Sequence, residues 1–166
     1  RRFRVFRQLV EDSEPADFLL VTKQGELMKK VVLAFSGGLD TSFCVPYLKE
    51  KGYEVYAATV DTGGFTRKEM TKIKNKANAL QVKKYFFIDG KQDLYHQIVS
   101  YIIKANVLRG DVYPLCAGPE RVIQATKVVE IAKQVGATAV AHGSTGAGND
   151  QVRFDVALKV LIPQVK

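Results

Sequence analysis

One stretch decides the fold of this chain, Val31-Val32-Leu33-Ala34-Phe35-Ser36-Gly37-Gly38-Leu39-Asp40-Thr41-Ser42. Five apolar residues typical of a buried strand run directly into a turn with two glycines and three hydroxyl groups, and then into a helical pattern. Glycine lets a backbone approach a bound group closely, and the free N–H groups of a first helical turn attract anions. No lysine follows the glycines, so the stretch is not a Walker A loop. The pattern favours a loop that holds the β- and γ-phosphates as a leaving group over an ordinary turn with Asp40 as helix N-cap.

A second glycine-rich stretch is His142-Gly143-Ser144-Thr145-Gly146-Ala147-Gly148-Asn149-Asp150-Gln151-Val152-Arg153-Phe154. Its three closely spaced glycines do not follow the G-x-G-x-x-G order of dinucleotide-binding loops. Asn149, Asp150 and Arg153 supply an amide, a carboxylate and a guanidinium, which suit a ligand with ammonium and carboxylate groups, such as an amino acid. A surface loop before a helix that starts at Asn149 is the alternative.

Apolar runs alternate with helical patterns along the chain. Strands are predicted at 31–35, 54–60, 84–88 and 137–141, and helices at 40–51, 66–80, 91–108 and 119–135. Pro119 and Gly136 suit the start and the end of the last helix. This alternation predicts a parallel sheet with helices on both faces, whose ligands bind beyond the carboxyl ends of the strands. Because both glycine-rich stretches follow predicted strands, we expect them to form one site.

The first stretch resembles a broad class of enzymes, and the second resembles one family within that class. The segment 36–42 resembles the signature loop of the ATP pyrophosphatases, which cleave ATP between its α- and β-phosphates, and the segment 142–154 resembles a stretch of the argininosuccinate synthases. The resemblance implies an α/β fold with a parallel sheet, a three-layer α/β/α sandwich of the adenine nucleotide alpha-hydrolase (HUP, PP-loop) type. It also implies ATP and Mg²⁺ as cofactors and citrulline and aspartate as substrates. The ureido oxygen of citrulline would attack the α-phosphorus to give a citrullyl-adenylate and pyrophosphate, and aspartate would then displace AMP.

The resemblance further assigns residues to the site. Those expected to bind the nucleotide are Ala34, Phe35, Ser36, Gly37, Gly38, Leu39, Asp40, Thr41, Ser42, Val60 and Gly143. Those expected to bind the substrates are Tyr113, Gly118, Thr145, Asn149, Asp150 and Arg153. Asp150 would pair with the ammonium of aspartate, and Arg153 would meet the carboxylate of citrulline.

Some positions depart from the family or stay open. Gly118 stands where many relatives have a citrulline-binding serine, so its backbone N–H or the side chain of Glu120 would have to replace that contact. Asp61 could cap a turn or orient water on magnesium. His142 is more typical of a structural residue than of a general base, and no catalytic residue or metal ligand is assigned.

Composition limits the other possibilities. The 166 residues are 46% hydrophobic and carry a formal net charge of +8, as expected for one folded domain. The spread of the lysines argues against specific nucleic-acid binding. No apolar run approaches the roughly 20 residues of a membrane span, and no signal peptide is evident. With only Cys44 and Cys116, a disulfide framework and a zinc site are both disfavoured, so a cytoplasmic protein is expected.

The domain organisation predicted from the sequence has two parts. Residues 1–27, with a strand-like piece at 18–22, form an N-terminal extension of unknown role, and residues 28–166 form the ATP-binding domain. Since the C-terminal synthetase domain of the family is missing, we expect a fragment that is inactive alone; the full-length family is a homotetramer. A tRNA-thiolating ATP pyrophosphatase and a non-catalytic nucleotide-binding module are the alternative hypotheses.

Overall fold

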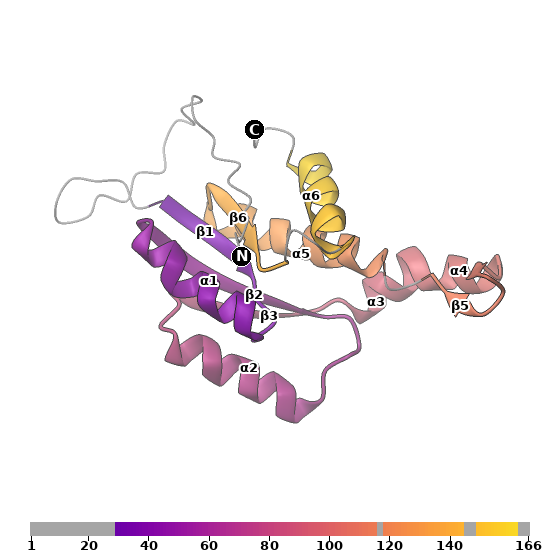
Figure 1. Cartoon of the computed structure of the whole chain (residues 1–166), viewed down its shortest axis with the longest axis horizontal. Coiled ribbons are helices and arrows are strands. Elements are labelled where there is room, and N and C mark those ends of the chain that lie inside the picture. Colours follow the sequence, from indigo (N-terminus) through magenta and orange to yellow (C-terminus); the bar gives the residue numbers. More distant parts are fainter. Residues whose placement is uncertain (1–28, 116–117, 145–148, 163–166) are drawn as a thin grey trace.

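The computed structural model describes residues 29–115, 118–144 and 149–162 and contains a parallel four-stranded sheet (Figure 1). Its strands are β1 (Lys29–Ala34), β2 (Tyr53–Asp61), β3 (Lys84–Asp89) and β6 (Ala139–His142), in the order β3-β2-β1-β6. The four predicted strands are confirmed, with ends shifted by one or two residues. Strand β1 pairs with β2 on one side and with β6 on the other.

Helices cover both faces of this sheet, as Figure 1 shows. Helices α1 (Leu39–Glu50) and α2 (Arg67–Ala79) lie on one face, and α5 (Glu120–Val135) lies on the other. Helix α6 (Asn149–Leu161) packs on α5 through Phe154, Ala157 and Leu158. The predicted three-layer α/β/α architecture is therefore confirmed.

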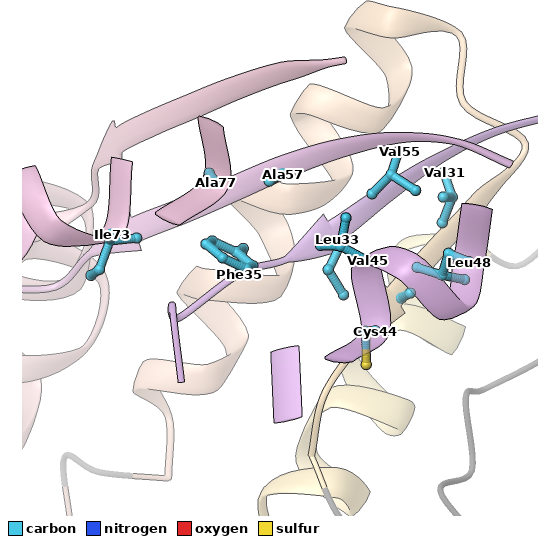
Figure 2. Close-up of a cluster of buried hydrophobic side chains, with 11 residues drawn as sticks. Val31, Leu33, Phe35, Cys44, Val45, Leu48, Val55, Ala57, Ile73 and Ala77 are labelled. Atoms are coloured by element: carbon cyan, nitrogen blue, oxygen red, sulfur yellow. The ribbon is translucent and has the colours of Figure 1, made fainter. Parts of the chain in front are cut away.

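The alternation of side chains along β1 and β2 divides the core into two halves. Val31, Leu33 and Phe35 point toward α1 and α2, together with residues from those two helices (Figure 2). Val32 points to the opposite face and packs in the cluster that contains Val128 of α5. Because successive strand residues face opposite sides, a strand buried on both faces must be apolar throughout, which explains the unbroken run 31–35.

The ends of two helices carry recognisable local signals. Thr66 and Glu69 form a reciprocal capping box at the start of α2, with Glu69 accepting from the Thr66 N–H at 2.8 Å. Gly136 ends α5 in the left-handed conformation with φ of 64°, as the sequence predicted. Glycine takes this conformation without the steric cost that a Cβ brings.

The predicted helix 91–108 is confirmed as far as Lys104 and ends four residues earlier than expected. It consists of α3 (Lys91–Leu94), the π-helical turn η1 (Tyr95–Val99) and α4 (Ser100–Lys104), which follow one another directly. Asn106, with φ of 47°, follows α4, and asparagine tolerates this left-handed conformation better than most residues, which lets the helix end there.

A short hairpin of β4 (Leu108–Arg109) and β5 (Tyr113–Pro114) follows, and together with α3, η1 and α4 it forms an arm that projects from the sheet (Figure 1). About half of the large apolar side chains exposed in the described structure lie on this arm.

None of the helices in the described part of the chain is long and apolar enough to cross a membrane. The strand-like piece at 18–22 lies outside the described residues.

Replacement of Val45 by Ala tests the packing of α1 on the sheet. Val45 is fully buried, whereas Val160 on α6 is 74% exposed. Val45→Ala should lower the free energy of unfolding by about 2 kcal/mol, because two methyl groups are lost and a cavity remains. The matched change Val160→Ala, also in a helix, should stay within about 0.5 kcal/mol. Urea denaturation measures both, and equal effects would contradict this packing.

Candidate active site

A cleft of about 390 Å³ opens where the order of the strands reverses. The chain runs from β1 to β2 and β3 on one side and returns through β6 on the other side of β1. The loops that leave the carboxyl ends of β1 and β6 therefore depart in different directions and leave a crevice between them. Ligands of open α/β sheets bind at such switch points.

The loop after β1 presents backbone N–H groups to the cleft. Helix α1 has no side-chain cap at its N-cap residue Gly38, and its first hydrogen bond runs from the Ser42 N–H to the Gly38 carbonyl at 3.1 Å. The N–H groups of Leu39, Asp40 and Thr41 precede this bond and have no helical acceptor. The alternative with Asp40 as N-cap is thus wrong, because Asp40 lies in the first turn.

The hydroxyl groups of this loop bond to one another and to its backbone. Ser36 Oγ lies 3.2 Å from Thr41 Oγ1, and the Gly38 N–H donates to Ser36 Oγ at 3.3 Å. The Ser42 hydroxyl donates to the Gly38 carbonyl at 2.6 Å. These bonds hold the loop in a tight curl around its own glycines.

The two glycine-rich stretches meet at the end of the sheet. Ala34 of β1 pairs with His142 of β6, so the next residues of both strands leave the sheet at the same level. A Cβ on Gly143 would lie 2.8 Å from Thr41 Cγ2 and 3.1 Å from the Thr41 backbone nitrogen. Such distances leave no room for a side chain, so glycine is needed here for close approach.

The start of the second loop is held by His142. Its Nε2 lies 3.0 Å from Asp155 Oδ1 of α6, its Nδ1 accepts from the Ser144 N–H at 3.3 Å, and its ring stacks on Phe154. The side chain is buried. These contacts on every side give His142 a structural role in joining β6 to α6.

Most of the residues predicted to bind the nucleotide line the cleft. They are Ala34, Phe35, Ser36, Gly38, Leu39, Asp40, Thr41, Val60 and Gly143. Gly37 and Ser42 belong to the same loop but are not among the lining residues.

The residues predicted to bind substrates are more dispersed. Asp150 lines the cleft, and Arg153 Nη1 donates to Asp150 Oδ1 at 2.9 Å. Gly118 lies against the guanidinium of Arg153, with a Cβ position 3.3 Å from Nε. Asn149 begins α6 and is exposed. Tyr113 lies on the projecting arm, is 56% exposed and does not line the cleft, while Thr145 lies outside the described residues.

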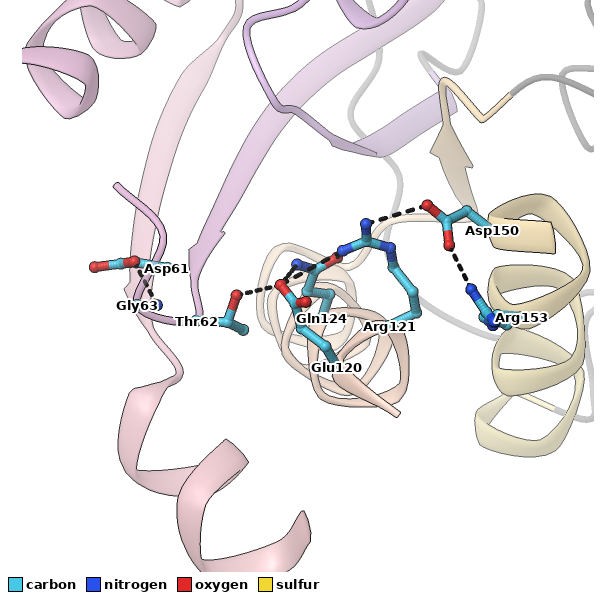
Figure 3. A network of polar contacts seen from close by, with 8 residues as sticks. All are labelled: Asp61, Thr62, Gly63, Glu120, Arg121, Gln124, Asp150 and Arg153. Atoms are coloured by element: carbon cyan, nitrogen blue, oxygen red, sulfur yellow. Dashed lines mark hydrogen bonds and ion pairs between the residues drawn. The ribbon is translucent and has the colours of Figure 1, made fainter. Parts of the chain in front are cut away.

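A polar network across the cleft wall was largely missed by the sequence analysis (Figure 3). Glu120 Oε1 accepts from the hydroxyl of Thr62 at 2.5 Å and from Gln124 Nε2 at 3.0 Å. Arg121 donates from Nη1 to Gln124 Oε1 and from Nη2 to Asp150 Oδ2, both at 3.1 Å.

The position of α5 in the chain gave a sequence signal for this network. A helix that connects two parallel strands runs antiparallel to them, so α5, which leads into β6, must begin near the carboxyl ends of the strands. That turn holds Glu120 and Arg121.

The charge of Asp150 is stabilised by both arginines. Burial by itself would raise the pKa of this carboxyl group, but the hydrogen bonds and positive charges of Arg121 and Arg153 outweigh it and lower the pKa. Asp150 is therefore an anion at neutral pH. Arg121 also forms an ion pair with Glu120, with 3.5 Å between Nη1 and Oε1, so the two guanidinium groups are balanced by two carboxylates beside the cleft.

Asp61, at the end of β2, accepts from the Gly63 N–H at 2.9 Å and from Lys91 Nζ at 2.8 Å. The first bond is the turn cap that was one of the two alternatives for this residue. Burial tends to raise its pKa, yet the Lys91 and backbone hydrogen bonds lower it overall. Because both carboxylate oxygens are engaged, Asp61 is poorly placed to bind magnesium.

The described residues contain no group of three or more His, Cys, Asp or Glu side chains able to hold a metal ion. A Mg²⁺ ion here would need the phosphate oxygens as its main ligands, the usual arrangement for this ion. Asp40, whose carboxylate belongs to a residue that lines the cleft, could supply one further ligand.

Comparison with known proteins decides the family. The sequence model described as "Arginosuccinate synthase N-terminal HUP domain" matches residues 30–166. The chain is 46% identical over 137 residues to an argininosuccinate synthase of Oenococcus oeni and 46% identical over 138 residues to one of Sulfolobus acidocaldarius, with 82% of the chain covered in each case. The chain belongs to the argininosuccinate synthase family.

These argininosuccinate synthases are longer proteins. The matched segment covers 34% of the first and 35% of the second, so the chain spans about a third of their length.

A solved structure titled as a predicted subunit of tRNA methyltransferase from Methanocaldococcus jannaschii has a TM-score of 0.51 and 23% identity, and covers 74% of this chain and 56% of its own. At that identity the likeness supports the fold alone.

Replacement of Asp61 by Asn tests the ion pair with Lys91. Asn keeps the oxygen that caps Gly63 but loses the charge, so stability at pH 7 should fall by about 2 kcal/mol. The pKa of Asp61 is lower in the folded than in the unfolded chain. Its contribution is therefore complete above about pH 4, the unfolded value, and is lost as the pH falls through the folded pKa.

The difference in stability between the unaltered chain and Asp61→Asn should accordingly shrink below about pH 4 in denaturant titrations. Asp89, the exposed second partner of Lys91, provides the control, because solvent screens its ion pair and Asp89→Asn should therefore have a much smaller effect. A difference that stays constant down to pH 2 would show that the Asp61 charge does not stabilise the fold.

Proposed function

We propose that this chain is the nucleotide-binding part of an argininosuccinate synthase and that its cleft holds ATP. The observation that supports this best is the contact of Gly143 with Thr41, which brings the two glycine-rich loops together at the rim of the sheet. One loop offers backbone N–H groups for phosphates, and the other leads to charged side chains suited to an amino acid. A reaction between ATP and an amino acid requires these two sites to adjoin.

The triphosphate would lie over the first turn of α1. The N–H groups of Leu39, Asp40 and Thr41 point from a helix N-terminus, where the helix dipole and the unpaired donors favour an anion. The hydroxyl groups of Ser36 and Thr41 would exchange their mutual bond for phosphate oxygens. When bound, Mg²⁺ would share the charge of the phosphates, with Asp40 as its protein neighbour.

The adenosine would extend along the strand ends toward Val60, which lines the same cleft. This part of the cleft is apolar and includes Ala58 and Phe65. An aromatic base gains from such surroundings by removal of apolar surface from water.

The amino acids would bind near Asp150. As the predicted partner of the aspartate ammonium, Asp150 can accept further hydrogen bonds beside those from Arg121 and Arg153, because a carboxylate has about four acceptor sites. Arg153 is 41% exposed at its side chain and retains donors for a citrulline carboxylate. Asn149 and Thr145 complete the predicted set.

Many relatives are expected to contact citrulline through a serine at the position of Gly118, and two groups could replace that contact here. Gly118 offers only its backbone, and Glu120 already accepts hydrogen bonds inside the cleft wall. Tyr113 would have to be brought to citrulline from the projecting arm.

The overall reaction proposed for the complete protein is the ligation of citrulline and aspartate with conversion of ATP to AMP and pyrophosphate. Its partners would be these small molecules rather than nucleic acid or a membrane, its assembly a homotetramer, and its setting the cytoplasm. The buried free thiol of Cys44 suits a reducing compartment.

Replacement of Gly143 by Ala tests the junction of the two loops. The new methyl group would meet Thr41 at 2.8 Å, and overpacking of this kind costs about 1–3 kcal/mol. ATP affinity, measured by isothermal titration calorimetry, should fall about tenfold. In the double variant Gly143→Ala/Thr41→Ser the clashing methyl of Thr41 is absent and its hydroxyl is kept, so affinity should partly recover. Unchanged affinity in Gly143→Ala would argue that ATP does not bind at this junction.

The reaction itself is tested in a protein that joins this chain to the C-terminal region of its relatives. Pyrophosphate release from ATP should depend on citrulline, and argininosuccinate should appear only when aspartate is also present. Release stimulated by tRNA instead of citrulline would favour the RNA-modifying alternative. ATP binding with no release under either condition would favour the non-catalytic module.

A further inference from the structure

A lysine outside the phosphate loop is bonded to the loop itself. Lys76, on α2, donates from Nζ to the carbonyl of Gly37 at 2.9 Å. We propose that Lys76 is a positioning residue that holds the Gly37–Gly38 peptide in the orientation needed to bind the β- and γ-phosphates. This inference rests on the proposed function, because it assumes that the loop binds phosphate.

The geometry of the peptide links Lys76 to the cleft. All described peptide bonds are trans, so the carbonyl of Gly37 and the N–H of Gly38 point in opposite directions. The carbonyl is directed to Lys76 behind the loop, and the N–H donates to Ser36 Oγ at 3.3 Å. Ser36 lines the cleft. By holding the carbonyl on the other side of the peptide, Lys76 therefore keeps the Gly38 N–H directed toward the cleft.

The same helix supports the loop at a second point. Gly37 has φ of 72°, and a Cβ there would lie 2.9 Å from Ile73 Cγ1. Ile73, which is buried, and Lys76 are three residues apart on α2, so they share one face of the helix. The loop is thus packed against Ile73 and hydrogen-bonded to Lys76.

A glycine pair needs such support more than other residues do. Glycine reaches many backbone conformations in the unbound loop, and each conformation with the peptide turned over would direct a carbonyl oxygen at the phosphates. The Lys76 ammonium disfavours that flip, because it would lose its acceptor. It also places a positive charge directly behind a loop that contains no lysine of its own.

The test compares Lys76→Met with Lys74→Met in the unaltered 166-residue background. Lys74 lies two residues away on the same helix, is exposed, and has no hydrogen bond or ion pair with another described residue. Calorimetric titration with ATP, inorganic pyrophosphate and AMP measures the three dissociation constants. Lys76→Met should weaken ATP and pyrophosphate about tenfold, the size expected for loss of one charged hydrogen bond, and should change AMP less than twofold.

The control Lys74→Met should change all three constants less than twofold, and Lys76→Arg, which keeps a charged donor, should recover much of the loss. Equal behaviour of Lys76→Met and Lys74→Met would overturn the inference and leave the proposed function intact. Equal weakening of ATP and AMP in Lys76→Met would also overturn it, since general damage to the domain would then be the cause. Failure of the unaltered chain to bind ATP or pyrophosphate would overturn the proposed function and this inference together.

Discussion

The site depends above all on the close contact between Gly143 and Thr41 at the carboxyl ends of β6 and β1. Adjacent parallel strands lie about 4.8 Å apart. The segments that leave two such strands can stay in backbone contact only if the residues between them have small side chains. Gly143 has no side chain, so the second loop stays against the first turn of α1. The fold thereby brings backbone donors and charged side chains to one cleft.

The charged wall is organised by hydrogen bonds between elements far apart in the sequence. Thr62 after β2, Glu120 and Arg121 at the start of α5, and Asp150 in α6 form one connected network (Figure 3). Each link is partly buried, where charge-assisted bonds are stronger than in water. The network therefore fixes how α5 and α6 stand against the sheet, which positions Arg153 and Asp150 as well.

Much of this arrangement could be predicted from the sequence because it follows from local patterns and one topological rule. The apolar run 31–35 and the glycines behind it predicted a buried strand and the loop that follows it, and the rule that loops at the carboxyl ends of parallel strands lie together brought the two glycine-rich stretches to one cleft. The end of α4 after Lys104 had one local signal, the Asn106 that takes the left-handed conformation, and the prediction of a helix to residue 108 did not use it. Arg121 and Lys76 were missed because their partners, Asp150 and Gly37, lie 29 and 39 residues away in the sequence, and such pairs are set by packing alone.

The two walls of the cleft depend on side chains to different degrees. The wall proposed to bind phosphate is made mainly of backbone N–H groups and of glycines, which contact Ile73 and Lys76 of α2 on their other side. Its function should thus depend on backbone shape more than on the identity of exposed side chains. The wall proposed to bind the amino acids consists of carboxylate and guanidinium groups, where one substitution removes a specific contact. Gly118 lies against the guanidinium of Arg153 and far along the chain from the loop after β1, so under the proposed function its departure from the family pattern would affect the amino-acid contacts and not the phosphate contacts.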